Sequence, residues 1–221
     1  MNNIICTVDV VLLTLQDDSL KVALLKRDRE PFKDAAALPG GYIHIDEDDD
    51  ARDAALRVLK EKAGIDAPYL EQLATFSGPV RDPRGWSVSI AYYALVPFEL
   101  IDRAGNPALK LANVDRPPSL PFDHRAIVKT AVSRLRSKSQ YSSLPCHLAG
   151  ETFTLPQLQR IYEALMGEPI NKVSFRRKMT EMDMLDVVDG RMEAHGAHRP
   201  AQVYRLKPAF RQRLQLLERG L

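Results

Sequence analysis

The alternation of apolar and polar residues predicts a first half rich in β-strands. Two runs rich in Val, Ile and Leu, at residues 4–15 and 20–26, flank a polar turn at residues 16–19. Such a pattern is typical of a β-hairpin. Two further strands are expected at residues 69–77 and 87–97, on either side of a turn-rich segment. The first half should therefore contain a β-sheet.

A helix and a long loop complete this half of the chain. Small and apolar residues recur at helical spacing between residues 50 and 63, and Gly64 follows as a stop signal. Residues 102–121 have the composition of a loop, because prolines stand at positions 107, 117, 118 and 121. A β-rich mixed domain should therefore end near residue 120.

The second half of the chain predicts helices followed by a β-wing. Residues 122–141 have the pattern of a basic helix. Thr154 is expected to cap the next helix, with Gln157 completing a capping box, and Asn171 is expected to cap a second, shorter helix. Two extended segments then flank a loop at residues 189–200, as in a wing. This order of elements predicts a winged helix-turn-helix domain.

Length and composition fit an α+β protein of two domains. The chain has 221 residues, of which 45% are hydrophobic and 27% charged, which suits one domain at residues 1–143, including a connector helix, and another at 150–221. No apolar run approaches the roughly 20 residues of a membrane-spanning helix, and no signal peptide is recognisable. We therefore expect a cytoplasmic bacterial protein without a membrane partner. Cys6 and Cys146 match no metal-ligand spacing.

Charge is unevenly distributed along the chain, although the formal net charge is only +2. From residue 121 onward, 17 Lys and Arg stand against 10 Asp and Glu, which gives +7 and leaves −5 for the first 120 residues. One interpretation is a chance asymmetry of solvated surface charge. The other, which we favour, is that the basic half meets a polyanion such as nucleic acid.

A second pattern begins with Leu-Pro-Gly-Gly at residues 38–41. Glu47 follows the second glycine after five residues, and Arg57, Glu61 and Gly64 follow further along. This arrangement resembles the Nudix box, whose pattern is Gly, five residues, Glu, seven residues, then Arg-Glu-apolar-x-Glu-Glu-x-Gly-apolar. The resemblance implies a Nudix-type α/β/α sandwich and, in active members, hydrolysis of diphosphates with Mg²⁺.

Three departures from the Nudix box remove carboxylate ligands that Mg²⁺ needs or change their spacing. Nine residues separate Glu47 from Arg57, Val58 replaces one glutamate, and Lys62 replaces another. Mg²⁺ prefers several oxygen ligands, and neither an isopropyl group nor an ammonium group supplies one. The sequence therefore predicts no catalytic residue, no bound metal and little or no hydrolysis, with residual pyrophosphatase activity left open. Acidic residues at positions 46–50 are an open alternative as metal ligands. They have a competing explanation, because acidic residues before a helix also interact favourably with its dipole.

A Nudix pocket can keep binding after it has stopped hydrolysing, because binding needs only shape and a few donors. Arginine suits diphosphate oxygens, and a tryptophan can stack on a base. For any single residue, a surface salt bridge or a place in the core is an equally good interpretation. The candidate ligand-binding residues are Arg27, Gly40, Gly41, Glu61, Arg81, Arg84 and Trp86.

The second helix of the C-terminal pair carries the candidate DNA-binding surface. Phe175 and Met179 fall on one face of it, so its basic residues should point outward. Such a helix suits the major groove, where arginine pairs with guanine edges and lysine holds phosphates. Taken alone, it equally fits a solvated basic helix. The candidate DNA-binding residues are Asn171, Lys172, Ser174, Arg176, Arg177 and Lys178, with His198 and Arg199 in the wing.

Nearly the whole chain resembles the Nudix-related transcriptional regulators called NrtR. The resemblance rests on the altered Nudix box and on the segments at residues 82–86, 153–163, 171–178 and 198–205. It implies a homodimeric repressor of NAD metabolism genes that binds a palindromic operator in double-stranded DNA. It also implies that the Nudix domain senses ADP-ribose or a related nucleotide as effector, and that no cofactor is required.

Two rival functions remain open. An active Nudix hydrolase of ADP-ribose or nucleotide sugars would use the C-terminal part only for dimerisation or substrate binding, and Val58 and Lys62 speak against it. The second rival is an RNA-binding adaptor with an inert Nudix fold. The sequence argues against it, because it lacks the aromatic residues interleaved on a sheet that such proteins use.

Overall fold

The computed structural model describes residues 4–67, 69–193 and 200–211. It divides into two compact units, of which the first comprises Met1–Thr14 with Leu20–Arg134 and the second Leu15–Ser19 with Leu135–Leu221. In the part of the chain that is described, no helix is both long and apolar enough to cross a bilayer.

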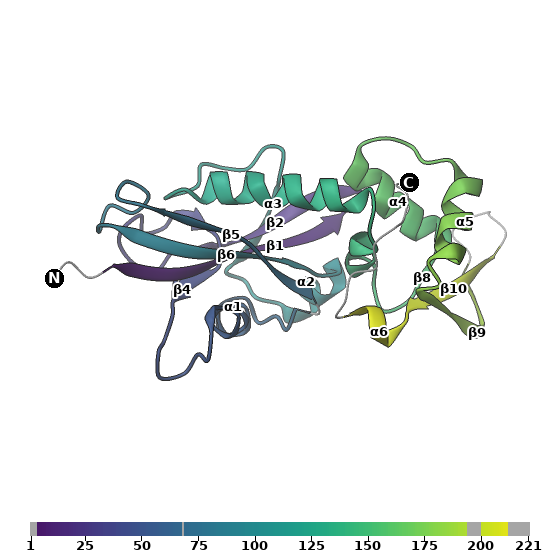
Figure 1. The fold of residues 1–221 in the computed structure, drawn as a ribbon, viewed down its shortest axis with the longest axis horizontal. Coiled ribbons are helices and arrows are strands. Elements are labelled where there is room, and N and C mark those ends of the chain that lie inside the picture. Colours follow the sequence, from purple (N-terminus) through teal and green to yellow (C-terminus); the bar gives the residue numbers. More distant parts are fainter. Residues whose placement is uncertain (1–3, 68, 194–199, 212–221) are drawn as a thin grey trace. The chain divides into compact units, whose positions relative to one another are not determined.

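The first unit is built on a seven-stranded sheet with the order β3-β2-β1-β6-β5, in which β4 pairs with β1 and β7 pairs with β2 (Figure 1). Its strands are β1 (Ile5–Gln16), β2 (Ser19–Lys26), β3 (Ala36–Ala37), β4 (Gly40–Tyr42), β5 (Tyr69–Gly78), β6 (Ser87–Leu95) and β7 (Leu109–Asn113). β1 runs parallel to β6 at the centre of the sheet. Its residues from Val8 to Leu13 are buried without alternation, as expected of a strand that is covered on both faces.

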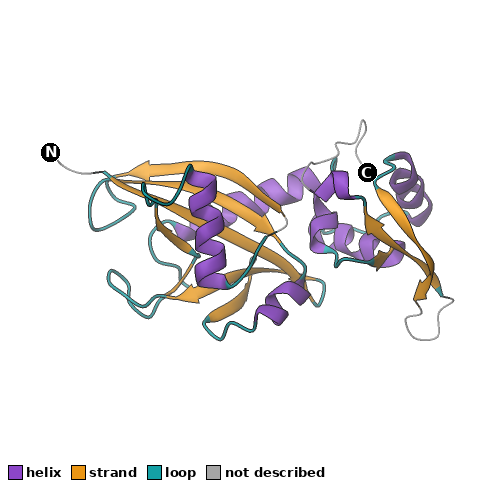
Figure 2. Cartoon of the chain, turned by 90° about the horizontal axis from the view of Figure 1, so that it is seen from below, coloured by secondary structure: helices purple, strands orange, loops and turns teal. Residues whose placement is uncertain are grey.

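Helices cover both faces of this sheet. α1 (Ala51–Val58) continues as a π-helical turn, Leu59–Ala63, and lies on the face opposite α3 (His124–Ser139), as Figures 1 and 2 show. The buried side of α1 packs Ala54, Ala55 and Val58 into the core of the sheet. Gly64 ends the turn in the left-handed conformation, where a residue without a Cβ is favoured. The predicted α/β/α sandwich is confirmed.

The prediction of a loop at residues 102–121 is wrong in part. α2 (Phe98–Ala104) overlaps its start, and β7 lies within it and pairs antiparallel with β2. A short strand at the edge of a sheet depends on its partner more than on its own sequence, so the prolines on either side dominated the pattern.

The second unit contains the predicted helix pair and wing. It consists of a 3₁₀ turn (Leu144–Leu148), β8 (Phe153–Thr154), α4 (Leu155–Met166), α5 (Lys172–Glu181), β9 (Leu185–Glu193), β10 (Ala201–Leu206) and α6 (Pro208–Arg211). The three strands form a sheet in the order β8-β10-β9. β9 extends to Glu193, so the wing loop is shorter than the predicted segment at residues 189–200.

Local signals explain why the helix pair forms at these positions. Thr154 and Gln157 form the predicted capping box at the start of α4, and Gly167 ends that helix with a positive φ of 77°. The Asn171 side chain accepts hydrogen bonds from two backbone N–H groups at the start of α5. Tyr162 of α4 and Phe175 of α5 pack edge to face at 5.4 Å, which fixes the helices against each other.

Candidate nucleotide site and DNA-binding helix

The Leu-Pro-Gly-Gly segment lies directly against the central strand and α1. Gly40 pairs with Asp9 of β1, and a Cβ at Gly40 would stand only 2.2 Å from the Asp9 Oδ1 atom. A Cβ at Gly41 would stand 3.1 Å from a methyl group of Val58. The two glycines of the box are therefore needed because neighbouring side chains approach their backbone closely.

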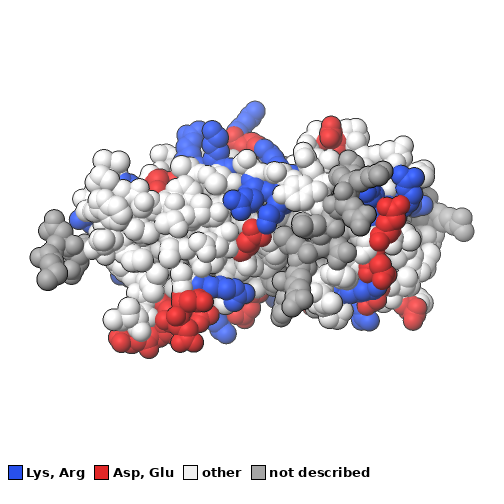
Figure 3. Space-filling model, viewed as in Figure 1, with Lys and Arg blue, Asp and Glu red and all other residues white. Residues whose placement is uncertain are grey.

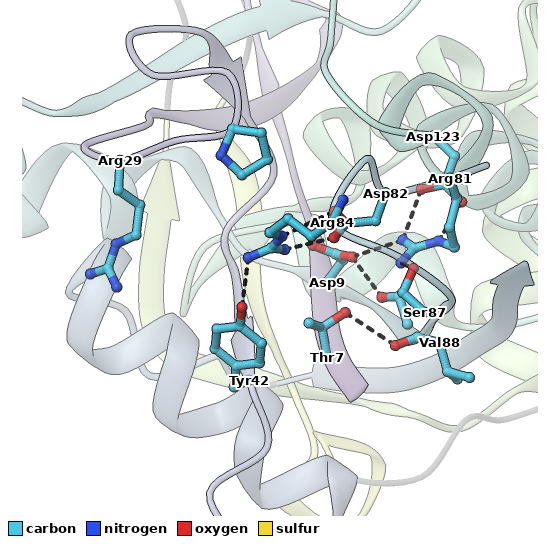
Figure 4. A network of polar contacts seen from close by, with 12 residues as sticks. Thr7, Asp9, Arg29, Tyr42, Arg81, Asp82, Arg84, Ser87, Val88 and Asp123 are labelled. Carbon is cyan, nitrogen blue, oxygen red and sulfur yellow. Dashed lines mark hydrogen bonds and ion pairs between the residues drawn. The ribbon is translucent and has the colours of Figure 1, made fainter. Parts of the chain in front are cut away.

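A buried polar network surrounds Asp9 (Figure 4). Arg81 donates two hydrogen bonds to the Asp123 carboxylate, at 2.9 and 2.8 Å, and one to Ser87 Oγ at 3.2 Å. The same guanidinium lies 3.6 Å from Asp9, which also accepts a hydrogen bond of 2.6 Å from Ser89 Oγ. Arg81, predicted as a diphosphate ligand, thus already has protein partners, and that ligand role stays a prediction.

His124, the first residue of α3, links this network to the segment at residues 38–41. Its Nδ1 accepts a hydrogen bond from the Leu38 backbone N–H at 3.1 Å, so the ring proton is on Nε2, which lies 3.4 Å from Asp9 Oδ1. Burial raises the pKa of Asp9, but His124, Ser89 and Arg81 together outweigh burial, so the pKa falls below its usual value. Asp9 is therefore a buried anion that holds several elements together.

Two arginines share one aromatic ring beside this network. The guanidinium carbon of Arg27 lies 4.9 Å from the centre of the Phe122 ring, and that of Arg84 lies 6.0 Å from it. Arg84 also donates a 2.6 Å hydrogen bond to the Tyr42 hydroxyl and pairs with Asp82 at 2.6 Å. Burial and repulsion by Arg84 lower the pKa of Arg27. Such a gathering of cations is suited to binding an anion.

Lys62 adds a further cation next to the Leu-Pro-Gly-Gly segment. Its ammonium group donates a hydrogen bond to the Gly40 carbonyl oxygen. Burial lowers its pKa, and so does repulsion by Arg29 and Arg27. The site therefore combines the backbone of the predicted box with four basic side chains, of which Arg29 and Lys62 were not predicted as ligand-binding residues.

The box arginine is paired with the acidic insertion. Arg57 donates to Asp48 through two hydrogen bonds of 2.8 Å and to the Tyr42 carbonyl oxygen at 3.0 Å. This contact lowers the pKa of Asp48 to about 2. Glu47 stands farther away, at 3.8 Å from Arg57, and Glu61 is exposed and lies 3.4 Å from the same guanidinium. The insertion thus supplies the carboxylate that fixes Arg57.

Acidic side chains gather over the loop between β4 and α1 (Figure 3). Within this loop Asp48 binds Arg57, and Asp50 caps α1 by accepting from the backbone N–H groups of Arg52 and Asp53. Among the described residues, no three His, Cys, Asp or Glu side chains stand close enough together to hold a metal ion. Metal ligands from residues 46–50 stay an alternative prediction.

Trp86, predicted to stack on a base, directly precedes β6 and is 45% exposed. Two aromatic residues that the sequence interpretation missed, Tyr42 and Phe122, contact the basic side chains instead. Tyr42 directly follows the Gly-Gly pair, which is the signal that could have found it. Phe122 stands in a segment whose sequence gives no comparable signal.

The candidate DNA-binding helix, α5, buries Phe175 and Met179 as predicted. Lys172, Ser174, Arg176 and Arg177 are exposed, and Lys178 is half-buried. Arg177 lies 3.6 Å from Glu181, one turn further along the helix. Asn171 caps the helix, which leaves its predicted DNA contact untested. His198 and Arg199 lie outside the described residues.

An exposed apolar residue on α5 escaped the sequence interpretation. Val173 is 76% exposed in the first turn of the helix, next to Lys172 and Ser174. In the major groove, an apolar side chain in this place suits the methyl group of thymine.

Comparison with known families divides the chain as the fold does. Residues 7–123 match the model of the NUDIX domain, and residues 145–206 match the model of the NrtR DNA-binding winged helix domain. The chain belongs to the NrtR family. The resemblance predicted from the altered box and the C-terminal segments is thereby confirmed.

Two relatives illustrate the range of activities around this NrtR-family chain. It is 38% identical over 210 residues to the ADPR responsive transcriptional repressor NtrR of Acinetobacter baylyi, a match that covers 90% of this chain and 80% of that protein. It is 36% identical over 112 residues to the ADP-ribose pyrophosphatase of Methanocaldococcus jannaschii, which covers 49% of this chain and 64% of that enzyme.

Two solved structures match the fold of this NrtR-family chain. NrtR of Shewanella oneidensis in complex with a 27mer DNA has a TM-score of 0.90 and 38% identity, covering 98% of this chain and 99% of the other. The NUDIX domain of the same protein in complex with ADP ribose has a TM-score of 0.52 and 34% identity, covering 61% of this chain and 90% of that domain.

Proposed function

We propose that this NrtR-family protein is a DNA-binding transcriptional repressor whose Nudix unit binds ADP-ribose or a related nucleotide as effector. One observation carries the proposal: the whole chain, Nudix unit and winged helix together, matches the DNA-bound NrtR of Shewanella oneidensis over 98% of its length. The similarity to a repressor described as ADPR responsive supports the effector.

The two sites have the chemistry that this function needs. In the first unit, Lys62 contacts Gly40, Arg84 contacts Tyr42, and Arg27 lies close enough to both cations for their charges to repel one another. A diphosphate bound there would neutralise this repulsion. In the second unit, α5 is held by buried Phe175 and Met179 and exposes its basic side.

We further propose that the Nudix unit does not hydrolyse its effector. Val58 packs against Gly41 and the Lys62 ammonium binds the Gly40 carbonyl oxygen, at the two places where the Nudix pattern has glutamates. The similarity to an ADP-ribose pyrophosphatase keeps hydrolysis as the second candidate function. Incubation with ADP-ribose and Mg²⁺ or Mn²⁺ distinguishes the two, because hydrolysis releases AMP. Turnover on the order of 1 per second or faster would establish the enzyme.

The resemblance to NrtR also supports proposals on the assembly and its targets. We propose a homodimer in the bacterial cytoplasm that binds a palindromic operator, with genes of NAD metabolism as targets and no required cofactor. A two-fold operator suits a dimer because each winged helix then reads one half-site.

The decisive experiment titrates the purified protein against the DNA upstream of its own and neighbouring genes, with and without ADP-ribose. Specific binding that ADP-ribose changes by about five- to 150-fold would match a typical allosteric coupling of about 1–3 kcal/mol. Binding to no upstream DNA, or only to all DNA alike, would contradict the regulator. Specific DNA binding whose affinity does not change with ADP-ribose would support the DNA-binding function but rule out ADP-ribose as the effector.

A further inference from the structure

Lys62 stands where the Nudix pattern has a carboxylate, and its side chain reaches back to the Leu-Pro-Gly-Gly segment. The ammonium group donates to the Gly40 carbonyl oxygen, and a Cβ on Gly41 would lie 3.6 Å from it. Lys62 follows α1 on the π-helical turn at Leu59–Ala63, which packs Leu59 and Ala63 into the core. The ammonium is therefore held by a rigid part of the first unit.

The surroundings of this ammonium group are themselves basic. Arg29 and Arg27 are near enough to oppose its charge, while Asp28 and Asp9 act in the other direction. Together with partial burial, the two arginines lower the pKa of Lys62. A cation kept among other cations gains most from an incoming anion, because the anion removes repulsion as well as adding attraction.

The same residues do not fit a divalent metal ion, which the Nudix family would imply here. Mg²⁺ requires a near-octahedral set of oxygen ligands. The Gly40 carbonyl oxygen already accepts a hydrogen bond from Lys62, a methyl group of Val58 faces Gly41, and Glu61 lies 3.4 Å from Arg57. A metal ion at this place would meet an ammonium group and a methyl group instead of carboxylates.

We propose that Lys62 binds the diphosphate of the effector directly, so that effector binding needs no divalent cation. This inference rests on the proposed function of the Nudix unit. The hydrogen bond to Gly40 uses one of the ammonium donors and fixes the group, and the remaining donors are free to bind phosphate oxygens. The fixed positive charge of Lys62 thus replaces the charge that a metal ion brings to active relatives, but without the Lewis acidity that hydrolysis requires.

Calorimetric titration with ADP-ribose tests the inference on the unmodified protein first. The expected dissociation constant is the same within about twofold in EDTA and in Mg²⁺. Binding that EDTA abolishes, or that Mg²⁺ strengthens about tenfold or more, would overturn the role of Lys62 while leaving the effector in place. Failure to bind ADP-ribose under both conditions would instead reject the proposed effector, and this inference with it.

Variants then assign the effect to one ammonium group. Lys62→Gln should weaken ADP-ribose binding in EDTA about tenfold or more, because it keeps length and polarity but removes the charge. Lys60→Gln is the matched control: Lys60 lies on the same turn, 3.6 Å from Asp66 at the surface, and its loss should change binding less than twofold. Trp86 fluorescence confirms that each variant is folded. Equal effects of the two substitutions would overturn the inference.

Discussion

Asp123→Ala tests the buried network that joins Asp9, Arg81 and the start of α3. The Arg81 side chain is 7% exposed and that of Asp123 is 22% exposed, and two hydrogen bonds of 2.9 and 2.8 Å join them. Removing one partner of a buried ion pair costs about 3–5 kcal/mol, because the other charge stays in a poorly solvated place. Since Asp123 is partly solvated and Asp9 remains 3.6 Å from Arg81, we expect about 2–3 kcal/mol here.

Urea unfolding followed by tryptophan fluorescence measures this loss. Trp86 is the only tryptophan and belongs to the first unit, so its signal reports the unfolding of that unit. With a urea dependence of about 2 kcal/mol per M, the midpoint should fall by about 1–1.5 M. Asp102→Ala removes an exposed carboxylate from α2 and should cost less than about 0.5 kcal/mol. Equal midpoints for the two variants would show that the network contributes no net stability.

Three further predictions follow from the contacts of single residues. Because Arg57 holds the pKa of Asp48 at about 2, below the usual 3.8, this pair stabilises the fold above about pH 4 and ceases to do so as the pH falls toward 2. Urea unfolding should therefore find Asp48→Asn less stable than the wild type at pH 7, by a margin that shrinks between pH 4 and 2. Arg176→Ala should weaken specific operator binding at least about fivefold, whereas Lys172→Ala should weaken binding to all sequences and reduce its salt dependence, both measured by fluorescence anisotropy. Val173→Ser should cost about 1 kcal/mol or more of discrimination at one T·A pair of the operator and leave non-specific binding unchanged, as competition with operator variants would show.

The elements that sequence predicted well are those with strong local signals. The capping box at Thr154, the Asn171 cap and the apolar face with Phe175 and Met179 are all present in the structure. Each depends on residues within a few positions of one another, so the sequence contains the whole interaction. β7 was missed because its hydrogen bonds go to β2, almost ninety positions away in the chain.

The sequence predicted which residues belong to the candidate site better than it predicted the contacts that they make. The altered box pointed to Val58 and Lys62, but not to the hydrogen bond that Lys62 makes with Gly40. Asp48 rather than Glu47 fixes Arg57, because the two-residue insertion brings a different carboxylate to the guanidinium. Such exchanges depend on the path of a loop in space, which spacing along the chain does not determine.

The predicted boundaries at residues 143 and 150 remain predictions, but contacts within the second unit argue for an earlier start of its fragment. Cys146 and Ala149 belong to the core of this unit, and the buried Tyr162 hydroxyl donates a 3.0 Å hydrogen bond to the Ser142 carbonyl oxygen. A fragment that begins at residue 150 loses both contributions. An unpaired buried hydroxyl alone costs about 1–3 kcal/mol.

One of the contacts between the candidate nucleotide site and α3 is a hydrogen bond to a buried histidine. The Leu38 N–H, two residues before Gly40, donates to His124, which is only 4% exposed and begins α3. Moving the Leu-Pro-Gly-Gly segment without moving His124 would leave this N–H unpaired in a place that water hardly reaches, at a cost of about 1–3 kcal/mol. Allosteric couplings are typically of that same size. A ligand that displaced the Leu-Pro-Gly-Gly segment would therefore act on the first residue of α3 with an energy of this size.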